Sequence, residues 1–257
     1  MKANCNSKEN VIIIGGGVGP MAGVDLHRLI IENTPTDGTD QDHLRILHIS
    51  FSDLIEDRTE SLKERTFGLP AAHMARLIEQ AMEFVLAYGC RGIAAVPCNT
   101  FHAEPIFNEF ARYLDHFGDT LSIINMIEET AEEIASSVPT GSEVAIISTT
   151  GTRESKLYEN ALKKRELVAV YPEDQVLIHQ AIYNETWGIK AASGKTGENQ
   201  EILYSAIEQL YQSSVSAIIL ACTEIPLVIR EDIYKGIPLI NPVDILSRAV
   251  IKASCTT

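Results

Sequence analysis

The chain has 257 residues, 45% of them hydrophobic, and a formal net charge of −14. This length can bury a large core, either as one α/β unit or as two domains, whereas the negative charge argues against nucleic acid and anionic membrane surfaces as partners. No apolar run approaches the ~18 residues of a membrane span. Residues 1–10 lack the apolar segment of a signal peptide, so we expect a cytoplasmic protein.

The first segment with a clear pattern is a strand, a glycine-rich loop and a helix. Residues 11–14 are apolar and β-branched, which is typical of a strand buried on both faces of a parallel sheet. The glycine-rich residues 15–20 follow, and residues 21–32 have helical spacing. Such a loop can approach a ligand closely, or it can be a tight turn without one. A dinucleotide fingerprint would need glycine in place of Pro20, so nucleotide binding is not favoured.

The rest of the chain alternates between strand and helix patterns. We predict strands at 44–50, 93–96, 121–126, 144–147, 217–221 and 237–240. We predict helices at 70–88, 103–117, 127–137, 174–183, 199–212 and 242–253. Small-residue loops are expected at 148–152 and 188–197, the latter mobile. No cysteine and histidine cluster has zinc-ligand spacing, so no metal site is expected.

The order of elements predicts an α/β fold with parallel sheets. Each half of the chain has a strand that leads into a small-residue loop, and later a long helix that precedes a strand ending in cysteine. We therefore predict two similar Rossmann-like lobes related by a pseudo-two-fold axis, residues 1–118 with 226–257 and residues 119–225. Ligands bind at the carboxyl ends of strands in such sheets, so the active site is expected in the cleft between the lobes.

Two cysteines, Cys98 and Cys222, stand where an apolar strand ends. Thr100 and Thr223 are expected to cap the helices that follow, with Pro226 in a first helical turn. A thiol at a helix N-terminus has its thiolate stabilised, so we expect these pKa values to move from about 8.5 toward neutrality. The simpler alternative is that both thiols are small core residues, which describes Cys90 well.

Two thiols can form a redox pair, a nucleophile with a spectator, or an acid–base pair on opposite faces of a bound carbon. The similar pattern in the two halves of the chain favours the third option, because inversion of a stereocentre requires two similar groups on opposite sides. The carbanion formed on the way needs hydrogen-bond donors aimed at its carboxylate. The candidates for this role are Asn99, Thr100, Thr150, Thr152 and Thr223.

Seven short motifs together resemble the cofactor-independent aspartate/glutamate racemase superfamily, above all its aspartate racemase branch. They occur in the family's order and span nearly the whole chain. The motifs are Gly16-Gly17-Val18-Gly19-Pro20, Asp57-Arg58-Thr59, Pro97-Cys98-Asn99-Thr100, Met126-Ile127-Glu128-Glu129-Thr130, Thr150-Gly151-Thr152, Gly188-Ile189-Lys190-Ala191 and Cys222-Thr223-Glu224-Ile225-Pro226.

The resemblance implies an isomerase that interconverts L- and D-aspartate, with glutamate as a second candidate, and that needs neither pyridoxal phosphate nor a metal. It implies two similar α/β domains, a homodimer, and Cys98 and Cys222 as the two bases. It also implies that Arg58 and Lys190 hold the side-chain carboxylate of the substrate. The residues agree with this role, because both are basic in a very acidic chain and a guanidinium matches a carboxylate well. Ordinary solvated surface charges are the alternative.

Some residues leave questions open. Val18 and Gly23 depart from the family's usual methionine and threonine, which puts the substrate preference in doubt. Glu224 is expected to orient a thiol or to bind the substrate ammonium, unless it is only a favourable acid at a helix start. His102 is expected to pack within a helix.

Alternative functions also remain on this scaffold. The first group comprises a broad-specificity amino-acid racemase, a hydantoin racemase and a maleate isomerase. Outside this group stand a non-catalytic amino-acid-binding relative and a thiol redox enzyme, which would need the two thiols within disulfide distance.

Overall fold

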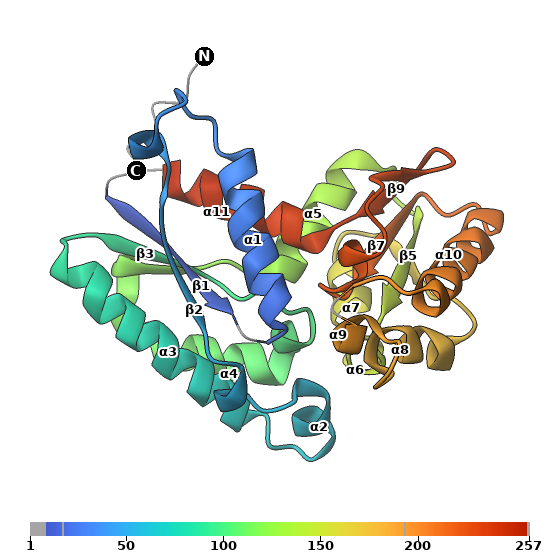
Figure 1. Ribbon diagram of the computed structural model, residues 1–257, viewed down its shortest axis with the longest axis horizontal. Coiled ribbons are helices and arrows are strands. Elements are labelled where there is room, and N and C mark those ends of the chain that lie inside the picture. Colours follow the sequence, from blue (N-terminus) through green and yellow to red (C-terminus); the bar gives the residue numbers. More distant parts are fainter. Residues whose placement is uncertain (1–8, 17, 193, 256–257) are drawn as a thin grey trace. The chain divides into compact units, whose positions relative to one another are not determined.

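The structure is a computed structural model that describes residues 9–16, 18–192 and 194–255. The chain divides into two compact units, unit 1 (Met1–Glu129 with Val243–Thr257) and unit 2 (Thr130–Pro242), each shown in Figure 1. Gly17, Ser193 and most of the polar N-terminal tail lie outside the described residues. Among the described helices, none has the length and apolar character needed to cross a membrane.

Unit 1 is built on a four-stranded parallel sheet in the order β2-β1-β3-β4. Its strands are β1 (Asn10–Gly16), β2 (Arg45–Ser50), β3 (Arg91–Ala95) and β4 (Leu121–Ile123). Its helices are α1 (Pro20–Asn33), α2 (Arg58–Lys63), α3 (Gly68–Ala87) and α4 (Glu104–Leu114), together with the start of α5 (Met126–Ser137) and nearly all of α11 (Pro242–Cys255). Short 3-10 turns connect them: η1 (Asp40–Asp42), η2 (Ser52–Leu54), η3 (Thr100–His102) and η4 (Asp115–Thr120).

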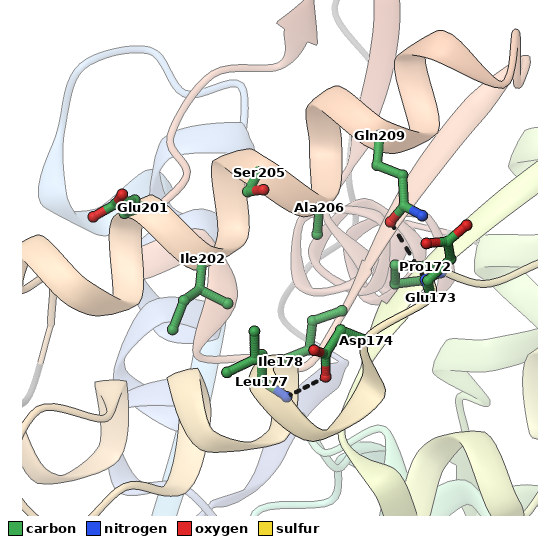
Figure 2. Close-up of a pocket in the computed structure, with 10 residues that line it drawn as sticks. All are labelled: Pro172, Glu173, Asp174, Leu177, Ile178, Glu201, Ile202, Ser205, Ala206 and Gln209. Atoms are coloured by element: carbon green, nitrogen blue, oxygen red, sulfur yellow. Dashed lines mark hydrogen bonds between the residues drawn. The ribbon is translucent and has the colours of Figure 1, made fainter.

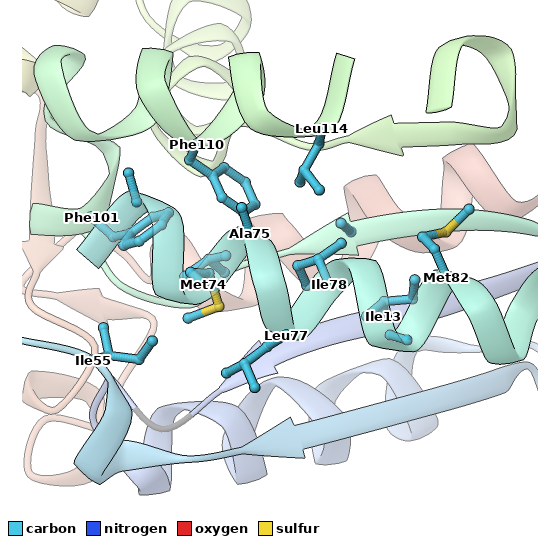
Figure 3. Close-up of a cluster of buried hydrophobic side chains, with 14 of the residues drawn as sticks. Ile13, Ile55, Met74, Ala75, Leu77, Ile78, Met82, Phe101, Phe110 and Leu114 are labelled. Atoms are coloured by element: carbon cyan, nitrogen blue, oxygen red, sulfur yellow. The ribbon is translucent and has the colours of Figure 1, made fainter. Parts of the chain in front are cut away.

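The core of unit 1 forms where α3 and α4 pack on the sheet. Ile13 of β1 meets Met74, Ile78 and Met82 of α3, and Phe110 of α4 closes the cluster (Figure 3). These side chains are fully buried. Since β1 and β3 each pair with two neighbours, their backbone groups are satisfied and their side chains are buried on both faces. The continuous apolar runs in the sequence have this physical cause.

Unit 2 contains a five-stranded sheet in the order β6-β5-β7-β9-β8. Its strands are β5 (Glu143–Ser148), β6 (Val168–Val170), β7 (Ala217–Ala221), β8 (Ile233–Tyr234) and β9 (Ile237–Ile240), of which only β8 runs antiparallel to its neighbour. Its helices are α6 (Thr150–Glu154), α7 (Leu157–Lys163), α8 (Gln175–Tyr183), α9 (Ile189–Ala192) and α10 (Gly197–Gln212), and η5 (Ile225–Leu227) follows β7. The core packs α8 and α10 against β5 and β7.

The two sheets repeat one strand order. The order β2-β1-β3-β4 in unit 1 corresponds to β6-β5-β7-β9 in unit 2, and in both the third strand leads to a cysteine. The expectation of two similar Rossmann-like α/β lobes with parallel sheets is confirmed at this level. The strand pairing also concerns the expected boundaries between the lobes. The strand β4 falls within the expected second lobe but joins the sheet of unit 1, and β9 falls within the expected first lobe but joins the sheet of unit 2.

The sequence patterns missed several short elements. The strand β6 and the helices α2, α7 and α9 were not predicted, because segments of three to seven residues carry too few positions to show a period. Within the glycine-rich segment at 188–197, which we expected to be mobile, residues 189–192 form the short helix α9.

Gly188, just before α9, is required by a close backbone approach. A Cβ atom built there would lie 2.5 Å from the backbone nitrogen and 2.6 Å from the backbone oxygen of Asn184. Backbone atoms cannot move aside as a flexible side chain can. The glycine therefore allows the tight turn of residues 184–188 that connects α8 to α9.

We predict that Gly188→Ala destabilises the protein by about 1–3 kcal/mol, the usual cost of overpacking. Gly197→Ala is the matched control, because a Cβ atom at Gly197 meets nothing within 4 Å. Urea denaturation of both variants gives the comparison. Equal stability of the two variants would contradict the close approach at Gly188.

Candidate active site

Cys98 lies just beyond the carboxyl end of β3, the strand between β1 and β4. Asn99 and Thr100 follow it directly, and Thr100 opens the turn η3. All three are buried. Within the described part of the chain, the Cys98 sulfur makes no hydrogen bond. The strand end thus presents a thiol, an amide and a hydroxyl in consecutive positions, as expected.

His102 connects this strand end to the start of α5. Its Nδ1 lies 2.9 Å from the Cys98 carbonyl oxygen, which can only accept, so Nδ1 carries the proton. Its Nε2 lies 3.3 Å from the backbone N–H of Met126 and can accept from it. The ring stacks on Phe107. Burial lowers the pKa of His102 to about 4, although the carbonyls of Cys98 and Ile124 oppose the change. His102 is thus a neutral, packed histidine that holds the Cys98 backbone.

Arg58 begins α2, which lies against η3. Asp57 caps this helix by accepting from the N–H groups of Thr59 and Glu60. The Arg58 Nη1 donates to the Glu56 carbonyl at 3.1 Å. This local network positions the guanidinium in the same unit as Cys98.

In unit 2, Cys222 lies beyond the carboxyl end of β7 and is 6% exposed. Its sulfur donates to Oε2 of Glu224 at 3.0 Å, and the Thr223 hydroxyl donates to the same oxygen at 3.1 Å. The other oxygen, Oε1, lies 2.5 Å from Nζ of Lys190 in α9. The structure thus brings four of the predicted residues into one connected group.

The charges in this group influence one another. Burial and the Glu224 carboxylate raise the pKa of Cys222 well above its ordinary value, against a smaller opposite effect of Lys190. Burial acts to raise the pKa of Glu224, but Lys190 and the donated hydrogen bonds outweigh it and the pKa is lowered. Burial likewise acts to lower the pKa of Lys190, which Glu224 raises overall. The ligand-free group is a thiol, a carboxylate and an ammonium.

Thr150 and Thr152 lie at the start of α6, just beyond the end of β5, which pairs with β7. Thr149, not predicted, is the cap of α6 and accepts from the N–H of Thr152 at 3.3 Å. The N–H of Thr150 lies 3.4 Å from Nδ1 of His179.

An aromatic pair on α8 continues from this turn to Lys190. The ring of His179 stacks on that of Tyr183, and Nζ of Lys190 lies 5.1 Å from the centre of the Tyr183 ring. Sequence reasoning missed both aromatic residues. Their spacing of four on a predicted helix, which places them on one face, was the available signal.

Tyr158 of α7 is a further residue that the sequence did not indicate. It is 1% exposed, is hydrogen-bonded to Thr130, and lies close enough to Cys222 to interact with it electrostatically. Burial raises the pKa of this phenol, so it is a neutral neighbour of the thiol. No signal pointed to it, because α7 itself was not predicted.

Two expectations about the strand ends are wrong. Asn99 and Glu224, and not Thr100 and Thr223, stand at the N-cap positions of η3 and η5, and neither side chain makes a capping bond. Pro226 does lie in the first turn of η5, as predicted. Because three-residue 3-10 turns replace the expected helices, little dipole is available. The pKa of Cys222 is accordingly raised and not lowered.

Asn199 anchors the segment that carries Lys190. It is fully buried, and its Nδ2 donates to the carbonyls of Trp187 at 2.9 Å and Gly194 at 3.1 Å. Its Oδ1 accepts from the N–H of Thr196 in a capping box of α10. The segment around α9 is therefore tied to α10 by one amide.

The described residues also form a groove away from the two cysteines and their neighbours. A groove of about 490 Å³ lies between α8 and α10 (Figure 2), and none of the predicted site residues lines it. Among the described residues, no three His, Cys, Asp or Glu side chains gather as metal ligands would.

Comparison with known proteins agrees with the fold and the motifs. The model of the Asp/Glu/Hydantoin racemase family matches residues 16–250. A glutamate racemase from Fusobacterium nucleatum is 28% identical over 186 residues, which cover 71% of this chain and 64% of that protein. The chain thus spans slightly less than two thirds of that relative's length.

Solved structures resemble the chain over nearly its whole length. An aspartate racemase from Picrophilus torridus has 26% identity and a TM-score of 0.72, covering 96% of this chain and 94% of its own. An aspartate racemase homologue from Pyrococcus horikoshii, at 22% identity, superimposes with a TM-score of 0.69 over 96% of this chain and 100% of its own. At that identity the second likeness shows the fold alone.

The neutral, buried His102 predicts a pH dependence of stability. Its native pKa of about 4 lies below the ordinary 6.5, so the unfolded chain binds this proton at higher pH. The contribution is complete above pH 6.5 and is lost as pH falls toward 4, by about 3 kcal/mol in all. In urea denaturation across this range, His102→Gln should flatten the rise of stability with pH.

His116→Gln, at an exposed position, is the control and retains His102 and therefore its slope. A His102→Gln variant with the wild-type slope would show that another group causes the pH dependence.

Proposed function

Because the chain belongs to the Asp/Glu/hydantoin racemase family, we propose that it is a cofactor-independent racemase that interconverts L- and D-aspartate, with glutamate as the second substrate to test. The observation that carries the proposal is the repeated strand order. In each unit the third strand of the sheet ends in a buried cysteine followed by polar side chains. Two equivalent thiols suit a reaction that has two mirror-image directions.

In the proposed mechanism, one thiol acts as a thiolate and removes the α-proton of the amino acid. The other thiol donates its proton to the opposite face of the α-carbon. Each cysteine changes between thiolate and thiol in one turnover, and the roles reverse for the opposite enantiomer. General acid–base groups of this kind contribute about 10²–10⁴-fold in rate.

The intermediate carbanion needs hydrogen bonds to its carboxylate, which Asn99, Thr100, Thr150, Thr152 and Thr223 would supply in this proposal. The side-chain carboxylate of an acidic substrate would bind Arg58 and Lys190. Arg58 donates to a backbone carbonyl through Nη1, and the planar fork of a guanidinium matches the geometry of a carboxylate. Lys190 already contacts Glu224, so a substrate carboxylate would share this ammonium.

The choice of an acidic amino acid draws support from the relatives. The similar protein from Picrophilus torridus is named an aspartate racemase and the one from Fusobacterium nucleatum a glutamate racemase. We further propose a homodimer, as the sequence resemblance implies, which light scattering of the purified protein tests.

We predict that the purified protein, without added cofactor, racemises aspartate when a panel of amino acids, a hydantoin and maleate is followed by chiral chromatography. Cys98→Ala and Cys222→Ala should each lower racemisation by about 10²–10⁴-fold. Cys90→Ala is the matched control, because Cys90 is also buried and its sulfur contacts Arg45 and the Tyr88 carbonyl.

Conversion of only a hydantoin or only maleate would replace the proposed substrate. Full racemisation by either Cys98→Ala or Cys222→Ala would remove that thiol from the mechanism.

A further inference from the structure

The carboxylate of Glu224 is the most highly connected group near Cys222. It is 5% exposed, and both of its oxygens are engaged. Oε2 accepts from the Cys222 thiol and the Thr223 hydroxyl, while Oε1 faces the Lys190 ammonium at 2.5 Å. A buried carboxylate needs this degree of satisfaction, because an unpaired one would protonate or destabilise the fold.

The direction of the contact between Cys222 and Glu224 is fixed by chemistry. An ionised carboxylate only accepts hydrogen bonds, so at 3.0 Å the proton must belong to the sulfur. A thiolate in the same place would put a second anion beside the carboxylate, with one ammonium to balance both. The geometry therefore favours Cys222 as a neutral thiol.

The other groups around Cys222 offset this effect only in part. Tyr158 of α7 and Tyr183 of α8 are phenols, and the pKa of Tyr158 is raised by burial. Lys190 is the one ammonium that the described contacts place in this group, and it is bound to Glu224. Its charge acts to lower the pKa of Cys222, but this effect is smaller than the opposite effect of the Glu224 carboxylate.

We propose that Glu224 is a positioning residue that holds Cys222 as a protonated thiol in the ligand-free chain, and that Lys190 is the counter-ion of this carboxylate, whose charge offsets part of its effect on the thiol. The proposal deepens the proposed racemase function and rests on it for its catalytic meaning. It gives Glu224 and Lys190 a role within the protein besides any contact with substrate.

The consequence for the reaction is that the two thiols are unequal at rest. The Cys98 sulfur has no hydrogen-bond partner within the described residues, and so no carboxylate holds its proton. In the direction in which Cys222 is the acid, Cys98 is the base. Its thiolate forms an S–H bond with the α-proton and the electron pair stays on the α-carbon. That carbon takes the proton of Cys222, whose S–H bond breaks to leave a thiolate.

The new thiolate of Cys222 lies beside Glu224 and is unfavourable there. It regains a proton from solvent while Cys98 loses its own proton to solvent, and this exchange restores the resting chain. Glu224 therefore sets the protonation state in which unliganded protein meets its substrate.

Alkylation of Cys222 in the ligand-free protein tests the proposed protonation state directly, because thiolates react and thiols do not. Iodoacetamide modification is followed by peptide mass spectrometry over a series of pH values, which resolves Cys222 from the other cysteines. Glu224→Gln should raise the rate at neutral pH about tenfold or more, equivalent to about one pKa unit. Lys190→Met should lower the rate at about pH 8.5, the ordinary pKa of a thiol.

Glu173→Gln, an exposed acid in the same unit, is the control and should leave the pH dependence of Cys222 unchanged. At high pH, where Cys222 is fully ionised, the limiting rate of alkylation depends on the access of the reagent alone. Comparison of this limiting rate between variants therefore separates a change in access from a change in ionisation. Opposite shifts in the two variants support the proposal, since a merely structural defect would move both in one direction. An unchanged curve for Glu224→Gln, or shifts of the same sign, would overturn it.

The test uses no substrate, so it fails independently of the proposed function. Opposite shifts without any racemisation would leave the Glu224 assignment standing and reject the racemase. Racemisation, together with an unchanged pH curve for the alkylation of Cys222, would support the racemase and reject the Glu224 assignment.

Discussion

The ion pair between Lys190 and Glu224 is the interaction on which the chemistry of unit 2 depends. Glu224 is buried and Lys190 is largely so, and burial of both charges is costly unless they are paired and hydrogen-bonded. Their contact joins α9 to the turn after β7, and through Glu224 it reaches Cys222. Loss of either partner would leave an uncompensated charge beside the thiol.

The elements around the pair of Lys190 and Glu224 hold it in place. Gly188 allows the tight turn between α8 and α9, and Asn199 ties the far end of that segment to α10. Tyr183 covers the ammonium with its ring. Unit 1 holds its thiol differently, because the neutral imidazole of His102 binds the backbone of Cys98, and the sulfur makes no hydrogen bond to the residues that the structure describes. Equivalent strands thus carry two thiols in different surroundings.

Much of this fold could be predicted because buried parallel strands have an unmistakable pattern. The apolar runs that became β1, β3, β5 and β7 are continuous, and the order of strands and helices leaves few topologies open. The cysteines were recognisable because each follows such a run. Short elements such as α7 and α9 have no period to detect, so Tyr158 and the setting of Lys190 could not be foreseen. The strand β9 was predicted, but nothing local says which sheet it joins.

The state of the thiols was beyond the reach of the sequence for a different reason. A motif places Cys222 before Thr223 and Glu224, but the pKa depends on distances and burial. The sequence argument assumed a helix dipole that stabilises a thiolate, but only a three-residue turn follows Cys222, while burial and the Glu224 carboxylate at 3.0 Å raise the pKa of the thiol. The sequence predicted local secondary structure, but it could not predict the electrostatic interactions between segments that are distant along the chain.

The central claim, that two thiols move a proton on and off one α-carbon, is tested most directly by racemisation of L-aspartate in heavy water. Mass spectrometry of the two separated enantiomers at early times shows where deuterium enters. Two bases predict that the D-aspartate formed carries deuterium while the remaining L-aspartate keeps its hydrogen. Equal deuterium in both enantiomers, or D-aspartate that retains the hydrogen of its substrate, would show a single base and contradict the claim.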